Sequence, residues 1–297
     1  MTQNKILLIG CDGQVGWELR RTLAPLGELA SASLCGRWGL KLDLADPASV
    51  EAAIRQVKPR IIVNAAAYTA VDKAESDAET AQRVNGDALG QIGALARELG
   101  ASVVHYSTDY VFNGASDVPY REEDPTAPLG VYGRTKLEGE RQLLASGAAA
   151  VILRTAWVYG ARGQNFLLTM KRLCNERPEV RVVNDQVGAP TWSRMLAEAT
   201  ALMLAQTRAD GFQFGERAGL YHLTNGGQTS WHGFASAIRE LLGASCTIHP
   251  IPTSDYPTPA RRPAYSVLDN RKIEQAFGIR LPDWRTALDL CTEGMIV

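Results

Sequence analysis

Tyr132 and Lys136 are four residues apart in the segment 131–140. If that segment is helical, the spacing places both side chains on one face, about one turn apart. A lysine ammonium beside a phenol stabilises the phenolate, so we expect Lys136 to lower the pKa of Tyr132 from its usual value of about 10. A tyrosine tuned in this way exchanges a proton near neutral pH. The same spacing alone is most often a surface contact, so the surrounding segments decide the interpretation.

Three glycines, Gly10, Gly13 and Gly16, follow directly after the apolar run 5–9 and lead into an amphipathic segment that extends to about residue 24. A strand, a glycine turn and a helix start together present backbone N–H groups to phosphate. The spacing is Gly-x-x-Gly-x-x-Gly, and glycine allows both the tight turn and the close approach of a pyrophosphate. The position favours a dinucleotide site over a purely structural turn.

The end of the second expected strand, 28–33, bears on the choice of cofactor. Many NAD sites carry an acidic residue there, about 20 residues past the glycines, which binds the adenosine ribose. This chain has Ser33 instead, and Arg37 follows. Small hydroxyls and an arginine favour the 2′-phosphate of NADPH, with NADH as the alternative. Asp43 is placed to reach the adenine amine, or else it is a turn residue before Asp46.

Apolar runs and helical segments alternate through the first half of the chain. We expect helices up to residue 24, at 47–57, at roughly 80–99 and from 131, and strands at 5–9, 28–33, 60–63, 102–106 and 151–154. Such alternation predicts an α/β fold with a Rossmann-like, doubly wound parallel sheet. Ligands of these sheets bind at the carboxyl ends of the strands, which is where segments 10–16, 65–68 and 107–109 fall.

Residues 161–297 contain shorter elements and more glycine, proline and arginine. We expect 1–160 to form an NAD(P)-binding domain, to which the chain later returns, and 161–297 to form mainly a smaller C-terminal substrate-binding lobe. The elements expected in the second half are helices at 165–176, 192–206, 231–242 and 284–293 and strands near 180–183, 220–223 and 246–249. The proline-rich loop 252–263 contains Arg261 and Arg262, which suit bidentate contacts with a phosphate; the alternative is a stiff linker.

The composition is that of a soluble globular protein with room for a large core, with 297 residues, 45% apolar and 21% charged. The formal net charge of −1 provides no basic field, so neither nucleic acid nor a membrane is expected as a partner. The N-terminus lacks the hydrophobic region of a signal peptide, and no apolar stretch approaches the length of about 18 residues that spans a membrane. These features predict a cytoplasmic protein.

The five cysteines are scattered, odd in number and without a Cys-x-x-Cys pair, so we expect reduced thiols instead of disulfides or a zinc site. The four histidines show no metal-ligand spacing. His105 lies in an apolar run and is expected to be a core residue.

Seven stretches of the chain carry a family resemblance. They are 13–19, 63–75, 106–112, 131–136, 154–159, 184–191 and 256–263. The runs Val-Asp-Lys-Ala-Glu at 71–75 and Tyr-Pro-Thr-Pro-Ala-Arg-Arg-Pro at 256–263 are far more specific than the tyrosine–lysine pair. Together the stretches resemble the extended short-chain dehydrogenase/reductase family, and within it the reductases of dTDP-linked 4-keto-6-deoxy sugars.

The resemblance implies a role for each matching residue. NADPH would be lined by Gln14, Val15, Asp43, Leu44, Ala66, Ala67 and Tyr68. Tyr132 would donate the proton, Lys136 would bind the nicotinamide ribose, and Thr108 would hydrogen-bond the carbonyl oxygen as negative charge develops on it. The dTDP-linked keto-sugar would be contacted by Thr108, Asp109, Trp157, Arg261 and Arg262.

The chain also departs from the family pattern. Relatives often have histidine where this chain has Tyr68, and asparagine where it has Tyr265. Some members form magnesium-bridged dimers that use glutamates, and Glu18 matches one such position. Arg194 stands in the stretch where a second glutamate is expected, and an arginine cannot bind Mg²⁺. The resemblance therefore allows a homodimer and leaves the use of Mg²⁺ open.

Two alternatives to a reductase remain at this point. The first is a nucleotide-sugar epimerase or dehydratase of the same superfamily; dehydratases add an acidic pair beside the catalytic threonine, which the run Thr108-Asp109-Tyr110 lacks. An epimerase keeps NAD bound and recycles it. The second is a non-catalytic, cofactor-binding regulatory subunit, against which the intact Tyr132 and Lys136 argue.

Overall fold

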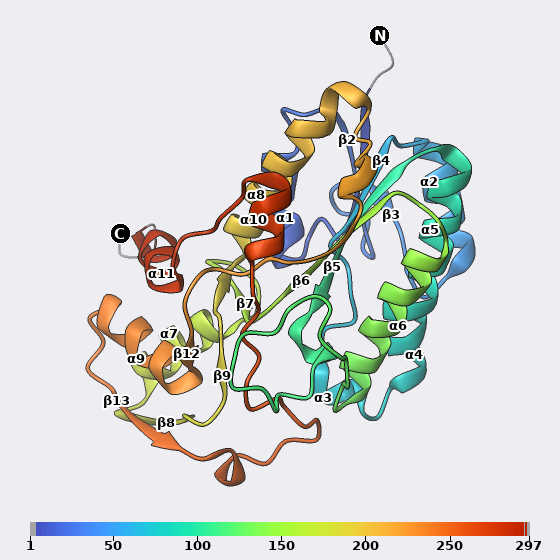
Figure 1. Cartoon of the computed structure of the whole chain (residues 1–297). Helices are drawn as coiled ribbons and strands as arrows, with labels where there is room; N and C mark the ends of the chain where they lie inside the picture. Colours follow the sequence, from blue (N-terminus) through green and yellow to red (C-terminus); the bar gives the residue numbers. More distant parts are fainter. Residues whose placement is uncertain (1–3, 294, 296–297) are drawn as a thin grey trace.

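A parallel sheet forms the centre of the molecule (Figure 1). The computed structural model describes residues 4–293 and 295. Within this range the sheet has seven strands in the order β11-β6-β5-β4-β1-β2-β3, and all neighbouring strands are parallel. Their bounds are β1 (Lys5–Ile9), β2 (Glu28–Ser33), β3 (Leu40–Lys41), β4 (Ile61–Asn64), β5 (Ser102–Thr108), β6 (Ala150–Thr155) and β11 (Gly219–His222). The predicted α/β fold with a Rossmann-like, doubly wound sheet is confirmed.

Helices cover both faces of this sheet (Figure 1). One face carries α1 (Gln14–Thr22), α8 (Ser193–Thr207) and α10 (Arg271–Phe277), and the other carries α2 (Pro47–Val57), α5 (Ala88–Leu99) and α6 (Val131–Ala145). Along β1, Ile6 and Leu8 join the core beneath α1 and α8, whereas Leu7 and Ile9 join the core beneath α2 and α5. Successive side chains point to opposite faces of the sheet, and both faces are covered by helices. Every position of the strand core is therefore apolar, and the sequence of β1 is an unbroken apolar run after Lys5.

The helical region expected at roughly 80–99 is real but interrupted. It consists of α4 (Ala78–Gln82), a π-helical turn at Arg83–Asp87, and α5. Such turns are rare and occur frequently at functional sites. Here the turn carries Asn85, whose side chain bonds both the backbone oxygen of Tyr68 and the hydroxyl of Thr135.

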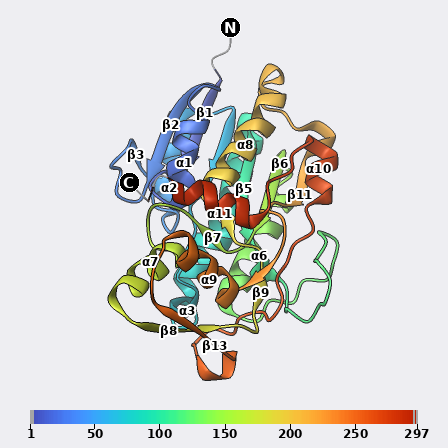
Figure 2. The same cartoon turned by 90° about the vertical axis from the view of Figure 1, so that its left-hand side faces the viewer.

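A smaller lobe lies at the carboxyl edge of the sheet (Figure 2). Its elements are β7 (Val158–Tyr159), α7 (Phe166–Glu176), β8 (Glu179–Val183), β9 (Val187–Gly188), β10 (Thr191–Trp192), β12 (Thr229–Ser230), α9 (Trp231–Leu241), β13 (Thr247–Ile251) and α11 (Trp284–Glu293). The helices and strands predicted after residue 160 are confirmed to within two residues at each end. Strand β11 and helix α8 return to the sheet half of the molecule.

Cys174 of α7 and Cys246, which directly precedes β13, form a disulfide with Cα atoms 5.1 Å apart. The expectation of five reduced thiols is therefore wrong for this pair. The two cysteines are 72 residues apart in the sequence, so only the folding of the lobe brings them together. Cys11, Cys35 and Cys291 are free.

The elements that the sequence did not predict are short. Helix α3 (Val71–Ala74) has four residues, and β3, β7, β9, β10 and β12 have two residues each. A periodic pattern needs a longer window than these segments offer. Helix α10 was also missed, although it has seven residues.

The helices are short compared with a lipid bilayer. Helices α6 and α8 have 15 residues each, whereas a membrane-spanning helix needs about 20. In the part of the chain that the structure describes, no helix is long and apolar enough to cross a membrane.

Candidate active site

Helix α6 carries Tyr132 and Lys136 and lies unusually close to its neighbours. A Cβ at Gly133 would be 2.2 Å from the backbone oxygen of Tyr110, and a Cβ at Gly139 would be 2.0 Å from that of Asn85. Only glycine fits at either contact. Gly133 therefore lets α6 approach the end of β5, where Thr108 lies, and Gly139 lets α6 approach the π-helical turn that carries Asn85.

Tyr132 lies beside Thr108, the last residue of β5. Tyr132 is half-buried and Thr108 is buried. Withdrawal from water raises the pKa of Tyr132 to about 12; the neighbouring Thr108 hydroxyl opposes this shift and the Asp109 carboxylate adds to it. The phenol therefore keeps its proton at neutral pH, as a proton donor must.

Lys136 does not act on Tyr132 in the expected way. Its Nζ donates to the backbone oxygen of Tyr106 at 2.6 Å and lies 3.0 Å from Nε2 of His105. Burial lowers the pKa of Lys136 to about 7, and the charge of Glu140 opposes the shift only in part. The expectation that Lys136 lowers the pKa of Tyr132 is therefore wrong in this structure, because the amine is itself desolvated and faces other partners.

His105 connects Lys136 to the neighbouring strand. Its ring is fully buried, as predicted for a core residue, and Nδ1 lies 3.2 Å from Nδ2 of Asn64 on β4. Burial, and then the charge of Lys136, lower the pKa of His105 well below its usual value, so the ring is neutral. The contact with Lys136 was not predicted from the sequence, where the one signal was the position of His105 on the strand that ends in Thr108.

Asp109 is a buried carboxyl group next to Thr108. Its Oδ1 accepts a hydrogen bond from Thr108 at 3.0 Å, and Oδ2 has no partner among the described residues. Burial raises the pKa of Asp109 to about 6, and the nearby hydroxyls of Ser266 and Thr108 oppose this shift. An unpaired buried oxygen of this kind is suited to a ligand hydroxyl.

The glycine turn fits a dinucleotide pyrophosphate. Gly10 has a φ of +83°, and a Cβ there would be 2.6 Å from the backbone nitrogen of Ala66. A Cβ at Gly16 would be 1.9 Å from the oxygen of Gly10. Helix α1 then begins at Gln14 after Gly13, with no side-chain cap from the described residues and no acidic residue in its first turn. Its first N–H groups are thus available to an anion.

Two arginine side chains lie against Trp38, in the segment that follows β2. Ser33 is buried beside the thiol of Cys35. The guanidinium of Arg37 lies 4.9 Å from the ring centroid of Trp38, and that of Arg20 lies 4.4 Å from the same ring. The segment after Ser33 therefore has two guanidinium groups at Trp38, and the carboxylate of Asp12 accepts a hydrogen bond from the thiol of Cys35 at 3.3 Å.

The other predicted cofactor residues follow strands β3 and β4. Asp43 accepts a hydrogen bond from the backbone nitrogen of Ala45 at 2.9 Å. Its side chain therefore stabilises a turn before Asp46, which was the alternative prediction for this residue. Leu44 is buried, and Ala66 and Ala67 are half-buried after β4. The hydroxyl of Tyr68 donates to Asp77 at 3.0 Å.

A loop from the second half of the chain reaches the glycine turn, which the sequence did not reveal. Asn165 donates to Oε1 of Gln14 at 2.9 Å, and the guanidinium of Arg162 lies 3.5 Å from the ring centroid of Trp17. Val15 packs instead against the core of the sheet half. Through Asn165 and Arg162, the segment that leads into the lobe thus contacts the glycine turn and helix α1.

Trp157 stacks on Trp231, with ring centroids 3.6 Å apart and an angle of 5° between the planes. It is held in a left-handed conformation with a φ of +48°. A Cβ at Gly188 would be 2.5 Å from the indole. Backbone strain of this kind persists where the surroundings fix the residue, and it clusters at ligand sites.

The two arginines of the proline-rich loop have different environments. Nη2 of Arg262 pairs with Oδ2 of Asp72 at 2.8 Å, while Arg261 is exposed. The structure therefore commits Arg262 to a protein carboxylate and leaves Arg261 accessible.

Glu18, the candidate metal ligand, faces a cation. Its Oε2 lies 3.8 Å from Nε of Arg194. Among residues 4–293 and 295, no group of three or more His, Cys, Asp or Glu side chains is arranged to hold a metal ion. The geometry thus offers Mg²⁺ no support at Glu18.

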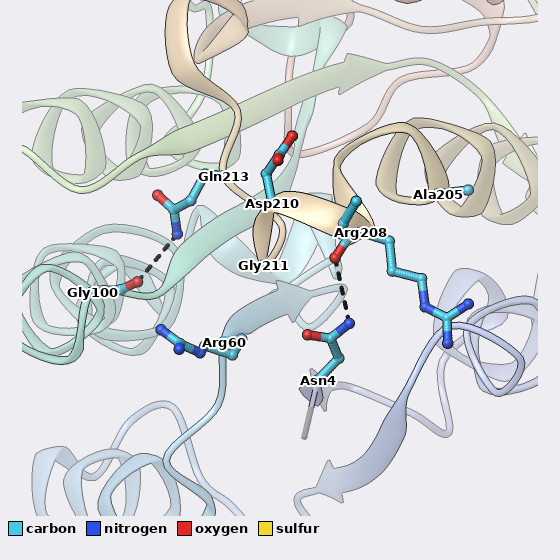
Figure 3. A pocket seen from close by; sticks show the side chains of 9 residues that line it. Asn4, Arg60, Gly100, Ala205, Arg208, Asp210, Gly211 and Gln213 are labelled. Carbon is cyan, nitrogen blue, oxygen red and sulfur yellow. Dashed lines mark hydrogen bonds between the residues drawn. The ribbon is translucent and has the colours of Figure 1, made fainter. Parts of the chain in front are cut away.

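A cavity of about 970 Å³ lies elsewhere, at the amino ends of β1, β4 and β5 (Figure 3). Figure 3 shows the side chains of Asn4 and Gln213 bonded to the backbone oxygens of Arg208 and Gly100. Ligands of doubly wound sheets bind at the opposite, carboxyl ends of the strands. The residues of the candidate active site all lie at those ends.

Comparison with known proteins identifies the family of this chain. The sequence model described as RmlD substrate binding domain matches residues 4–296. The dTDP-4-dehydrorhamnose reductase of Burkholderia thailandensis is 48% identical over 300 residues, which cover 98% of this chain and 99% of that protein. The crystal structure of a dTDP-4-dehydrorhamnose reductase from Clostridium acetobutylicum has a TM-score of 0.89 at 35% identity, covering 99% of this chain and 100% of that one. The Bacillus anthracis enzyme, solved in complex with NADP, has a TM-score of 0.88 at 30% identity over 98% and 99%.

The parallel sheet with a glycine turn after β1, together with relatives named as reductases, places the chain among the oxidoreductases of the extended short-chain dehydrogenase/reductase class. The matches extend over nearly the full length of this chain and of its relatives. The chain belongs to the dTDP-4-dehydrorhamnose reductase family.

Proposed function

We propose that this protein reduces dTDP-4-dehydrorhamnose to dTDP-L-rhamnose, with NADPH as the reductant and Tyr132 as the proton donor. The observation that carries the proposal is the phenol of Tyr132 beside the hydroxyl of Thr108 at the carboxyl edge of the sheet, where burial raises the pKa of the phenol. The names of the relatives supply the substrate, and the NADP complex of the Bacillus anthracis enzyme supports the cofactor.

The chain's own residues fit NADPH at two points. The open start of α1, after Gly13, would hold the pyrophosphate, and Arg37 and Arg20 would attract the 2′-phosphate beside Ser33. When bound, NADPH supplies the hydride. Lys136 would bind the nicotinamide ribose, a step for which its amine would turn from His105 or Tyr106.

Tyr132 and Thr108 would act on the sugar carbonyl. Thr108 donates a hydrogen bond to the oxygen as negative charge develops on it, and Tyr132 transfers its proton to that oxygen to give the hydroxyl. Asp109 would accept a hydrogen bond from a sugar hydroxyl through its unpaired oxygen. Trp157 would line the sugar nucleotide, and Arg261 would reach the pyrophosphate with Arg262 holding the loop in place.

NADPH absorbance, followed with dTDP-4-dehydrorhamnose as substrate, tests the proposal. Steady NADPH oxidation that depends on the keto-sugar supports it. An epimerase would instead carry stoichiometric NAD after purification and would consume no NADPH, and a regulatory subunit would bind NADPH without turnover. The cytoplasmic location and a homodimer remain predictions from the sequence.

A further inference from the structure

The run Val-Asp-Lys-Ala-Glu at 71–75 has no role in the chemistry described so far, although it is one of the two most specific stretches of the sequence. It forms helix α3 and the residue that follows it. Two carboxylates leave this short segment in different directions. Asp72 contacts the proline-rich loop, and Glu75 contacts helix α6.

Asp72 binds the proline-rich loop through three hydrogen bonds. Arg262 donates to its two oxygens at 2.8 Å and 3.2 Å, and the backbone nitrogen of Ala260 donates at 3.2 Å. The same guanidinium also bonds the backbone oxygen of Ala260 and the hydroxyl of Thr258. A planar, forked cation is well suited to such multiple contacts. Arg262 therefore stabilises the conformation of the loop through contacts within it, and Asp72 attaches the loop to α3.

Glu75 binds the start of helix α6. Its Oε1 accepts a hydrogen bond from the backbone nitrogen of Val131 at 2.8 Å. The N-cap of α6 is Gly130, which has no side chain to offer. A Cβ at Gly130 would be 2.6 Å from the Glu75 carboxylate, so the glycine gives the acid room. Glu75 thus caps α6 from outside, one residue before Tyr132, and its charge complements the helix dipole.

A second contact joins the two regions. The ring of Tyr110 meets that of Tyr132 edge-on, with centroids 5.5 Å apart. Tyr110 is also close enough to Arg262 for the guanidinium charge to act on its phenol. The loop that carries Arg261 and Arg262 is therefore connected to Tyr132 both through α3 and through Tyr110.

We propose that Asp72 and Glu75 are positioning residues of the reductase, which fix the loop 256–263 and the start of α6 to the same short helix. Asp72 holds the loop where it meets the sugar nucleotide, and Glu75 holds Tyr132 where it meets the carbonyl. The kinetic part of this inference rests on the proposed function.

The two residues should have different kinetic signatures. Asp72→Asn should raise KM for dTDP-4-dehydrorhamnose on the order of tenfold with little change in kcat, because it loosens a binding loop. Glu75→Ala should lower kcat on the order of tenfold with little change in KM, because it loosens the residue that donates the proton. Glu75→Gln keeps an acceptor oxygen and should recover most of that loss. Glu98→Gln, in an exposed pair with Arg55, is the matched control.

Wild-type KM in Asp72→Asn together with wild-type kcat in Glu75→Ala would overturn the proposal. An equal change of both parameters in each variant would also overturn it, since general destabilisation would then explain the result. Both measurements require that the wild-type protein oxidises NADPH with the keto-sugar.

Two further measurements need no turnover and so separate this proposal from the proposed function. Trypsin cuts after Arg261, which is exposed, and cannot cut between Arg262 and Pro263. Asp72→Asn should accelerate the cut after Arg261 on the order of tenfold under native conditions, because local opening exposes the loop. Glu75→Ala should raise amide hydrogen exchange at the start of α6. Unchanged cleavage and exchange would refute the positioning roles even in an active enzyme, whereas changed values in a protein without reductase activity would refute only the proposed function.

Discussion

The sheet half and the smaller lobe are held together by different interactions. In the sheet half every residue of β5 is buried, and beneath α6 the pair Glu140–Arg154 has side chains that are 3% exposed on both partners. In the lobe the strands associate only in pairs, and the packing is supported by the Trp157–Trp231 stack and the disulfide Cys174–Cys246. The groups that we propose to react thus lie on the half with the seven-stranded sheet, whereas Trp157, which we propose to line the sugar nucleotide, lies on the half with the smaller sheets.

Tyr132→Phe separates the role of the phenol in proton transfer from its role in packing, and it should have the largest effect on kcat. Removing the phenol proton should lower kcat about 10²–10⁴-fold, while NADPH binding and the melting temperature stay close to wild type, since the ring still packs. Tyr221→Phe removes a hydroxyl on β11 that donates to the backbone oxygen of Arg217, outside the site, and serves as the control. Turnover of Tyr132→Phe within a few-fold of wild type would exclude this residue as the proton donor.

Glu140→Gln tests how strongly the sheet half depends on its buried ion pair. Arg154 donates to both oxygens of Glu140, at 2.9 Å and 2.7 Å, and Ser107 donates to the same carboxylate. Loss of the negative charge leaves the guanidinium buried without a counter-ion, so the free energy of unfolding should fall by about 3–5 kcal/mol. Urea titration measures the change. Glu98→Gln breaks an exposed pair and should cost less than about 1 kcal/mol; equal losses in the two variants would contradict the role of burial.

The same contrast explains what the sequence could predict. Strands of the sheet half appear as apolar runs because both faces are covered. The rule that ligands bind at strand ends points to segments 10–16, 65–68 and 107–109, while the roles of single residues came from the family resemblance. Partners on different elements could not be predicted, because no local pattern connects them. The contact between His105 and Lys136 crosses from β5 to α6, and Asp72 meets Arg262 over 190 positions of sequence.

Cys174→Ser tests whether the lobe depends on its disulfide. The bridge joins residues 72 apart, and a crosslink of that span restricts the unfolded chain, so its loss should lower the free energy of unfolding by about 2–4 kcal/mol. Cys35→Ser, at a free and exposed thiol, is the matched control and should be neutral. Intact mass after alkylation without reductant counts the free thiols; labelling of all five cysteines would show that the bridge is absent.

Comparison with Lys136→Met should show how burial of the Lys136 amine makes the free energy of unfolding depend on pH. The pKa of Lys136 is lowered to about 7 in the folded protein from 10.5, so between these values the unfolded chain binds more protons than the folded one. The free energy of unfolding of the wild type should therefore rise with pH across this window, relative to Lys136→Met, by on the order of 1 kcal/mol per pH unit. Below pH 7 both states are protonated and the difference between the proteins becomes constant. Parallel stability curves from pH 7 to 10 would mean that Lys136 stays charged in the fold, and the ammonium would then be available to Tyr132 as the sequence first suggested.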